Sequence, residues 1–134
     1  MINKEDANIL IVDDIEDNRY TLERRLKRDG YKNLFSAEGG KVALDMASKN
    51  NFDLILLDLM MPDMSGLEVL KHLKGDPLQR TIPVIMVTAS DEVETAAECI
   101  INGADDFITK PFNGTLLKAR VGASLEKKRL RDSE

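Results

Sequence analysis

Two stretches decide the fold of this chain: Ile9-Leu10-Ile11-Val12-Asp13-Asp14 and Leu54-Ile55-Leu56-Leu57-Asp58. Each is a short, continuous run of aliphatic side chains that ends in carboxylates. Continuous runs, in contrast to alternating apolar and polar residues, are typical of parallel strands covered by helices on both faces. We therefore expect both stretches to be strands of an α/β domain.

Helical stretches separate the apolar runs. We expect strands at about 8–13, 32–37, 53–58, 82–88 and 106–109, with helices at about 16–29, 41–49, 65–75, 91–102 and from 113 onward. Gly30 and Gly103 take helix-stop positions, and Ser65 with Glu68 fits a capping box. This alternation indicates βαβ units and one parallel sheet. The second strand is expected at an edge of the sheet, because it is the least apolar.

Composition limits the class of protein. The 134 residues suffice for one domain, and 24 acidic against 19 basic residues give a net charge of −5, which argues against a nucleic-acid-binding surface spread over the domain. The single cysteine, Cys99, rules out an internal disulfide and favours a reducing compartment. No apolar stretch approaches the roughly 20 residues that span a bilayer. We expect a cytoplasmic protein without membrane contact.

Side chains that can bind a metal ion or a phosphoryl group follow four of the five expected strands. They are Asp13 and Asp14 after the first, Asp58 after the third, Thr88 after the fourth and Lys110 after the fifth. The carboxyl ends of parallel strands lie at one edge of a sheet, where α/β domains bind ligands. If the first and third strands are neighbours, about 4.8 Å apart, the three carboxylates crowd together and need a cation among them. Mg²⁺, a hard ion with oxygen ligands that keeps several waters, fits this need.

A magnesium ion held by few protein ligands usually serves to bind a phosphate group. Asp58 is the candidate nucleophile, because a carboxylate can form an acyl phosphate. The metal, Lys110 and Thr88 would share the three phosphoryl oxygens, since phosphoryl transfer depends on positioning and charge neutralisation. The set therefore predicts a phosphoaspartate site.

Four motifs carry a resemblance to a known family. They are Ile9-Leu10-Ile11-Val12-Asp13-Asp14, Leu57-Asp58-Leu59-Met60-Met61-Pro62-Asp63-Met64-Ser65-Gly66, Val87-Thr88-Ala89 and Gly103-Ala104-Asp105-Asp106-Phe107-Ile108-Thr109-Lys110-Pro111-Phe112. In this order and spacing they make the chain resemble the receiver domain of bacterial two-component response regulators over nearly its full length. The resemblance implies a flavodoxin-like (βα)5 fold, a three-layer sandwich around a parallel five-stranded sheet of order 2-1-3-4-5.

The resemblance also implies roles for individual residues. Asp58 is the phosphoacceptor, supplied by a sensor histidine kinase, a phosphotransfer protein or a small phosphodonor. Asp14, Asp58 and the backbone carbonyl of Met60 ligate Mg²⁺, and Asp13 acts largely through a bound water. Thr88, Lys110 and the backbone N–H groups of Met60 and Ala89 hold the phosphoryl group.

The family further implies a signalling switch. Phe107 turns inward when Thr88 moves toward the phosphate, and the Lys110-Pro111 bond is cis. The surface of the fourth helix, fifth strand and fifth helix is then bound by an output domain, a downstream protein or a second copy of the chain. Such a domain is regulatory and catalyses only its own phosphoryl transfer and dephosphorylation.

The last nine residues form a separate feature. We assign residues 1–125 to the receiver domain and 126–134 to a basic C-terminal helix extension, because no helix stop occurs between Leu116 and Arg131. Its cations would complement the helix dipole, contact nucleic acid, or belong to a stalk joined to an output module such as a nucleotide cyclase or phosphatase. A dimerising helix is a further reading of the same extension. We favour the stalk and expect no direct nucleic-acid contact.

Other readings remain beside this one. The serious alternative is a receiver-like interaction module that signals without phosphate, and Mg²⁺ binding would distinguish the two. Met60, two residues after Asp58, is apolar and cannot orient a hydrolytic water, so we expect a long-lived phosphoryl group. Asp63 is interpreted as a loop or capping residue and Gly66 as a requirement of backbone geometry.

Overall fold

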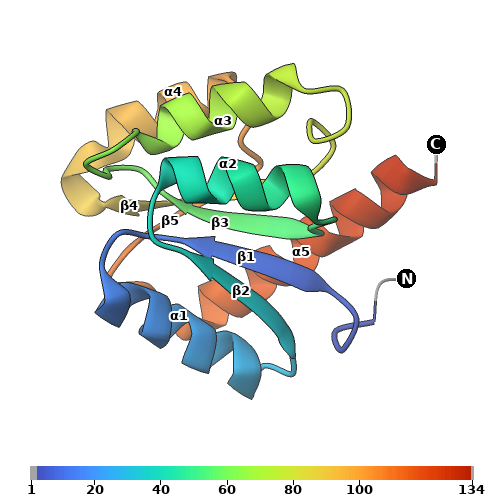
Figure 1. The fold of residues 1–134 in the computed structure, drawn as a ribbon. Helices are drawn as coiled ribbons and strands as arrows, with labels where there is room; N and C mark the ends of the chain where they lie inside the picture. The colour runs from blue at the N-terminus through green and yellow to red at the C-terminus, as the bar shows by residue number, and fades with distance from the viewer. Residues whose placement is uncertain (1–2, 134) are drawn as a thin grey trace.

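The five strands lie parallel in the order β2-β1-β3-β4-β5, as the resemblance implied (Figure 1). The computed structural model describes residues 3–133. The strands are β1 Asn8–Val12, β2 Asn33–Ala37, β3 Leu54–Asp58, β4 Val84–Ala89 and β5 Asp106–Lys110. The helices are α1 Glu16–Arg28, α2 Gly40–Lys49, α3 Gly66–Gly75, the short 3-10 turn η1 Ser90–Glu92, α4 Val93–Ile101 and α5 Gly114–Asp132. The predicted fold class and the edge position of the second strand are confirmed.

Helices cover both faces of the sheet, with α2, α3 and α4 on one side and α1 and α5 on the other (Figure 1). The side chains of β1 divide between the two faces: Leu10 and Val12 belong to the core under α2 and α3, and Ile9 and Ile11 to the core under α1 and α5. Because successive residues of a strand point to opposite faces, a continuous aliphatic run fills two cores at once.

Most element boundaries have a local cause. Gly30 and Gly103 adopt φ values of 103° and 108°, which let the chain leave α1 and α4 in the left-handed region that suits glycine. The hydroxyl of Ser65 accepts a hydrogen bond from the Glu68 N–H at 3.2 Å, which caps α3 as expected. The fourth strand begins at Val84, later than predicted. Pro83, just before it, has no N–H to donate to the sheet.

The C-terminal helix continues to Asp132 and touches the domain near its end. The guanidinium of Arg131 donates to Asp105 Oδ1 at 2.7 Å and to the carbonyl of Thr81 at 3.1 Å. The side chain of Asp105 is 4% exposed and that of Arg131 34%, so this ion pair is partly shielded from water. Two other basic residues of the extension pair with acids of the same helix, Arg129 with Glu126 and Lys128 with Asp132. Residue 134 lies outside the described part.

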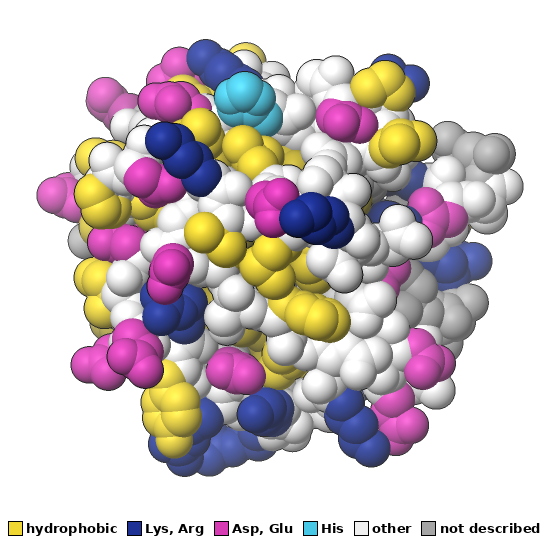
Figure 2. Space-filling view, in the orientation of Figure 1, with side chains coloured by type: hydrophobic (Ala, Val, Ile, Leu, Met, Phe, Trp, Pro, Cys, Tyr) yellow, Lys and Arg dark blue, Asp and Glu magenta, His cyan; other side chains and the backbone are white. Residues whose placement is uncertain are grey.

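Charge is distributed without one dominant sign on the visible face. Figure 2 shows acidic and basic side chains interspersed, with basic groups gathering along the lower edge, over α1. The last turn of α1 carries Arg25, Lys27 and Arg28, which complement its dipole. None of the helices within residues 3–133 combines the length and the apolar composition needed to cross a membrane.

Candidate functional site

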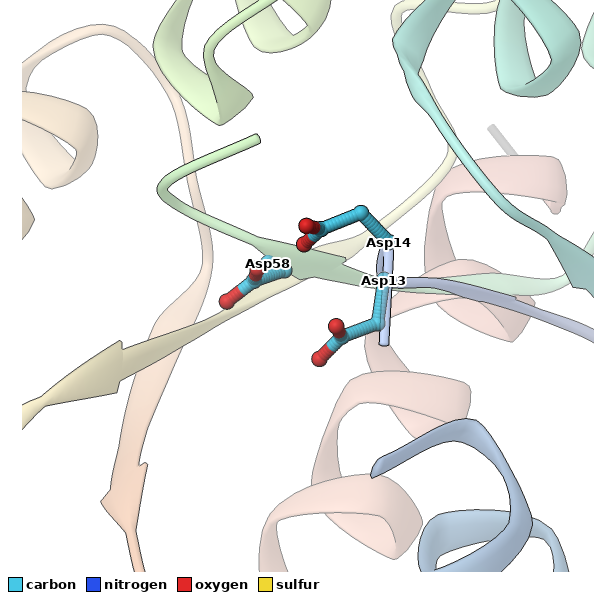
Figure 3. Close-up of side chains that lie close together, drawn as sticks. All are labelled: Asp13, Asp14 and Asp58. Carbon is cyan, nitrogen blue, oxygen red and sulfur yellow. The ribbon is translucent and has the colours of Figure 1, made fainter. Parts of the chain in front are cut away.

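Three carboxyl groups meet at the carboxyl ends of β1 and β3 (Figure 3). The pairing of Val12 with Leu57 brings Asp13, the next residue, beside Asp58, the last residue of β3. One oxygen from each of Asp13, Asp14 and Asp58 lies within 4.8 Å of the others. Asp13 and Asp58 are 1% and 5% exposed, whereas Asp14 faces solvent. The predicted convergence of the three acids is therefore what the structure contains.

Lys110 supplies the positive charge of the site. Its ammonium lies 2.9 Å from Asp58 Oδ1 and 3.3 Å from Asp13 Oδ2. Lys110 ends β5, and the bond to Pro111 is cis, as expected. Burial by itself lowers the pKa of the Lys110 ammonium, but its hydrogen bond to Asp58 and the charges of Asp58 and Asp13 outweigh burial and raise it. The lysine therefore stays protonated beside the acids.

Asp58 is the most perturbed carboxyl of the site. Burial raises its pKa to about 6; the hydrogen bond from Lys110 opposes the rise, and the charges of Asp13 and Asp14 add to it. A carboxylate in this state is ionised above neutral pH yet poorly solvated. Both properties suit a nucleophile that becomes more stable once a cation or an electrophile approaches.

The donor set fits a hard divalent cation. Asp13 Oδ1 accepts a hydrogen bond from the Ile15 N–H at 2.9 Å, whereas among residues 3–133 the buried Asp13 Oδ2 has the Lys110 ammonium at 3.3 Å and no hydrogen bond of good geometry. A buried carboxylate oxygen left without a hydrogen bond is costly unless a metal or a water satisfies it. The three convergent carboxylates offer only oxygen ligands. Mg²⁺ prefers oxygen, whereas softer metals prefer nitrogen or sulfur. The residues present therefore fit Mg²⁺.

The fourth and fifth strands complete the edge. In the sheet register Thr88 lies opposite Thr109 and Ala89 opposite Lys110. The Thr88 side chain is 0% exposed, and within the described residues its Oγ1 has no hydrogen-bond partner. The hydroxyl of Thr88 therefore has a donor hydrogen that none of the described residues accepts.

The backbone N–H of Ala89 is already engaged. It donates to a carboxylate oxygen of Glu92 at 2.7 Å, within the turn formed by η1. Sequence reasoning predicted a phosphoryl-binding role for this N–H and did not identify Glu92. An acid three residues after Ala89 is the only local signal, and it also fits an ordinary helix cap.

Two further predicted residues differ in their surroundings. Met60, two residues after Asp58, is 63% exposed. Phe107 is half-buried against the core beneath α3 and α4. The guanidinium of Arg120 lies 6.0 Å from its ring centroid and donates to its backbone carbonyl. Phe107 thus has the core on one side and a cation on the other.

The loop after Asp58 is held from two directions. Gly66 approaches so closely that a Cβ there would lie 2.4 Å from the carbonyl oxygen of Asp58, which explains the glycine by backbone geometry, as predicted. Asp63 caps α2 from a distance in sequence: its carboxylate accepts from the N–H groups of Gly40 at 3.2 Å and Lys41 at 3.1 Å. These hydrogen bonds hold the pKa of Asp63 below its usual value.

The family model described as the response regulator receiver domain matches residues 9–122. The chain belongs to the response regulator receiver family. This receiver domain is 45% identical over 115 residues to the response regulator PleD of Caulobacter vibrioides, matching 86% of this chain and 25% of that protein. It is 34% identical over 127 residues to the chemotaxis protein CheY-3 of Vibrio cholerae, matching 95% of this chain and 97% of that protein.

Solved structures show the same architecture. The receiver domain resembles the receiver domain of the Francisella response regulator 1452 with a TM-score of 0.81 and 31% identity, over 90% of this chain and 98% of that one. It resembles NtrX of Brucella abortus in complex with ADP with a TM-score of 0.87 and 30% identity, over 95% of this chain and 29% of that one. A probable cyclic di-GMP phosphodiesterase of Vibrio cholerae is 40% identical to it over 126 residues.

Family membership establishes the class of function. A response regulator receiver domain is a regulatory domain and serves as a phosphorylation-based switch in two-component signal transduction. The receiver domain spans about a quarter of the length of PleD and 28% of the phosphodiesterase. What those longer proteins do as a whole is therefore a property of those proteins.

Proposed function

We propose that Asp58 accepts a phosphoryl group, with Mg²⁺, from a sensor histidine kinase, a phosphotransfer protein or a small phosphodonor. The observation that carries the proposal is the buried Asp58 carboxylate with the Lys110 ammonium 2.9 Å away and two further acids within 4.8 Å. A structural ion pair needs one acid for one lysine. A divalent metal ion would account for the excess of carboxylate at this point, and its positive charge would also suit a phosphoryl group.

The chemistry requires little beyond position and charge. A carboxylate oxygen of Asp58 attacks phosphorus and forms an O–P bond, while the bond between phosphorus and the donor's histidine nitrogen or acyl oxygen breaks and its electron pair stays with the donor. When bound, Mg²⁺ supplies positive charge to the phosphoryl oxygens, and Asp14, Asp58 and the Met60 carbonyl would hold it, with Asp13 acting largely through a water. Lys110, Thr88 and the N–H groups of Met60 and Ala89 take the remaining contacts.

The signal is a change of the surface formed by α4, β5 and α5. Thr88, whose hydroxyl is buried among residues that offer it no hydrogen bond in the described chain, moves toward the phosphoryl group, and Phe107 follows into the vacated space. Moving a two-state population from 1:99 to 99:1 takes about 5.5 kcal/mol of differential stabilisation. Exposed apolar side chains, Ile100 and Ile101 on α4 and Leu116 on α5, provide contact area for an output domain, a downstream protein or a second copy.

The C-terminal segment belongs to the same proposal. Residues 126–134 extend the receiver domain of residues 1–125 and serve as a helical linker to an output module or as a dimerising helix. Support comes from the continuity of α5 to Asp132 and from the greater length of PleD and the phosphodiesterase.

The alternative is an interaction module that signals without phosphate. Such a module would have no use for the joint presence of Asp13, Asp14, Asp58, Thr88 and Lys110 at one edge. The set therefore favours the phosphorylated switch.

Intact-mass analysis tests the proposal. The protein and its Asp58→Asn variant are incubated with acetyl phosphate, with and without Mg²⁺. A Mg²⁺-dependent, hydroxylamine-labile phosphoryl adduct is expected on the wild type only. The absence of any adduct, with fold and Mg²⁺ binding intact, would leave a domain that accepts phosphate only from a kinase, or the phosphate-independent module.

A further inference from the structure

Two acceptors compete for the backbone N–H of Ala89. In the structure it donates to the Glu92 carboxylate at 2.7 Å, a short distance for a charge-assisted hydrogen bond. In the proposed function the same N–H binds an oxygen of the phosphoryl group on Asp58. One N–H cannot make a full hydrogen bond to both acceptors, and both acceptors are anionic.

Two other groups proposed to bind the phosphoryl group, Thr88 and Lys110, are engaged differently from the Ala89 N–H. Thr88, the preceding residue, is fully buried with an unsatisfied hydroxyl, measured against residues 3–133. Lys110 lies opposite Ala89 in the register of β4 and β5 and reaches Asp58 at 2.9 Å. Lys110 is thus paired with the phosphoacceptor Asp58 itself, whereas the Ala89 N–H is held by Glu92, a carboxylate outside the group of acids at the site.

We propose that Glu92 is a built-in competitor of the phosphoryl group: its carboxylate occupies the Ala89 N–H in the unphosphorylated state and must leave when Asp58 is phosphorylated. The inference rests on the proposed function and concerns the regulation of that site. Glu92 therefore lowers the affinity of the site for a phosphoryl group and favours the unphosphorylated conformation.

Release of Glu92 also transmits the signal. Glu92 is the last residue of η1 and the residue immediately before α4, and its hydrogen bond to Ala89 closes the turn between β4 and α4. When the N–H donates to the phosphoryl group instead, that turn loses the side-chain hydrogen bond that closes it. Phosphorylation is thereby coupled to the start of α4 through one side chain, in addition to the movement of Thr88 and Phe107.

A purely capping role for Glu92 gives a different expectation. A residue that only satisfies a backbone N–H would change stability when replaced and leave phosphoryl binding unaltered. A competitor, in contrast, improves phosphoryl binding when it is removed. The sign of the change in affinity therefore separates the two roles.

The test measures binding of beryllofluoride, a stable phosphoryl mimic, to the Mg²⁺-loaded protein by calorimetry. Glu92→Ala is expected to bind about tenfold more tightly than the wild type, the change that corresponds to one charge-assisted hydrogen bond partly compensated by water. Glu92→Gln, which keeps an acceptor but loses the charge, should fall in between. Glu94→Gln removes an exposed acid of the same segment and should match the wild type.

The amide of Ala89 provides a second readout. In ¹⁵N–¹H spectra without beryllofluoride, the Ala89 resonance should shift in Glu92→Ala and exchange faster with solvent, but remain in place in Glu94→Gln. Equal affinity of Glu92→Ala and the wild type, with the Ala89 resonance shifted, would overturn the competition while leaving the proposed function intact. A wild type that binds Mg²⁺ but not beryllofluoride would remove the proposed function, and the inference with it.

Discussion

The ammonium of Lys110 lies 2.9 Å from Asp58 Oδ1, so a side chain from β5 reaches across β4 to the last residue of β3. The same ammonium is 3.3 Å from Asp13 Oδ2, at the end of β1. One cation therefore connects three strands through two nearly buried acids. In the metal-free protein this arrangement limits the repulsion among the carboxylates.

Replacement of Lys110 should destabilise the metal-free protein. In Lys110→Met the buried acids lose their cation, and we expect the free energy of unfolding at neutral pH to fall by about 1–3 kcal/mol. Urea unfolding with and without Mg²⁺ measures this, and Mg²⁺ should restore much of the loss. Lys118→Met removes an exposed lysine of α5 and serves as the control. Equal unfolding of both variants would contradict the interpretation.

The raised pKa of Asp58 predicts a pH-dependent gain in stability on its removal. With a pKa of about 6 in the folded state and about 3.9 in the unfolded chain, the folded state binds the proton more tightly. Ionisation of Asp58 therefore costs stability above pH 6, by up to about 3 kcal/mol. This cost disappears as the pH falls below about 4.

Asp58→Asn should accordingly be more stable than the wild type near pH 8 without Mg²⁺, and the difference should shrink as the pH falls from about 6 to about 4. Guanidinium unfolding of both proteins over this range gives the comparison. A difference that does not change with pH would show that Asp58 titrates normally in the folded protein.

Gly66 should tolerate no side chain. A Cβ at this position would lie 2.4 Å from the Asp58 carbonyl oxygen and 2.9 Å from Leu59 Cα, so Gly66→Ala forces the backbone apart and costs about 1–3 kcal/mol. Gly122→Ala is the matched control, because a Cβ there meets no atom of the described residues within 4 Å. That control should be stabilising by roughly 0.5–1 kcal/mol, the usual gain in a helix interior. Denaturant midpoints of the two variants should therefore move in opposite directions.

The end of α5 should contribute unequally to stability. Arg131→Gln breaks an ion pair with the nearly buried Asp105 and is expected to cost about 1–2 kcal/mol. Arg129→Gln breaks a solvent-exposed pair with Glu126, which water and salt screen, and should cost much less. Urea unfolding distinguishes the two, and hydrogen exchange should show faster opening of the last helical turns in Arg131→Gln only.

The lifetime of the phosphoryl group should depend on Met60. This side chain, two residues after Asp58, is 63% exposed, and because it is apolar it cannot orient a water molecule by a hydrogen bond. Met60→Asn should therefore shorten the half-life of the phosphorylated protein severalfold, measured as loss of the phosphoryl adduct by intact mass after removal of the donor. An unchanged half-life would mean that the hydrolytic water approaches by another path.

The strands and the site edge were predictable because they depend on local patterns. Aliphatic runs with a polar residue at the end specify both a strand and a side chain at its carboxyl end, and the resemblance supplied the strand order. Helix ends were predictable where one residue decides them, as Gly30 does. Pro83 shifted the start of β4 because the loss of one N–H outweighed an apolar neighbour.

The contacts that escaped prediction join residues through exact geometry. Glu92 meets the Ala89 N–H only because the chain forms a 3-10 turn after β4. Asp63 was expected to be a loop or capping residue, but not to cap a helix that begins 23 residues earlier, and Arg131 contacts Asp105 from 26 residues away. No local sequence pattern predicts such pairs, because each depends on how the whole fold places two elements.

The segment after Asp58 and the turn before α4 are held by different numbers of contacts. The two hydrogen bonds of Asp63 tie the segment after Asp58 to the first turn of α2, and Gly66 presses the same segment against β3. On the other side, the turn between β4 and α4 is closed by the single side chain of Glu92. We therefore expect a change at Asp58 to displace the start of α4 more readily than the start of α2, a preference that these contacts establish in the unphosphorylated protein.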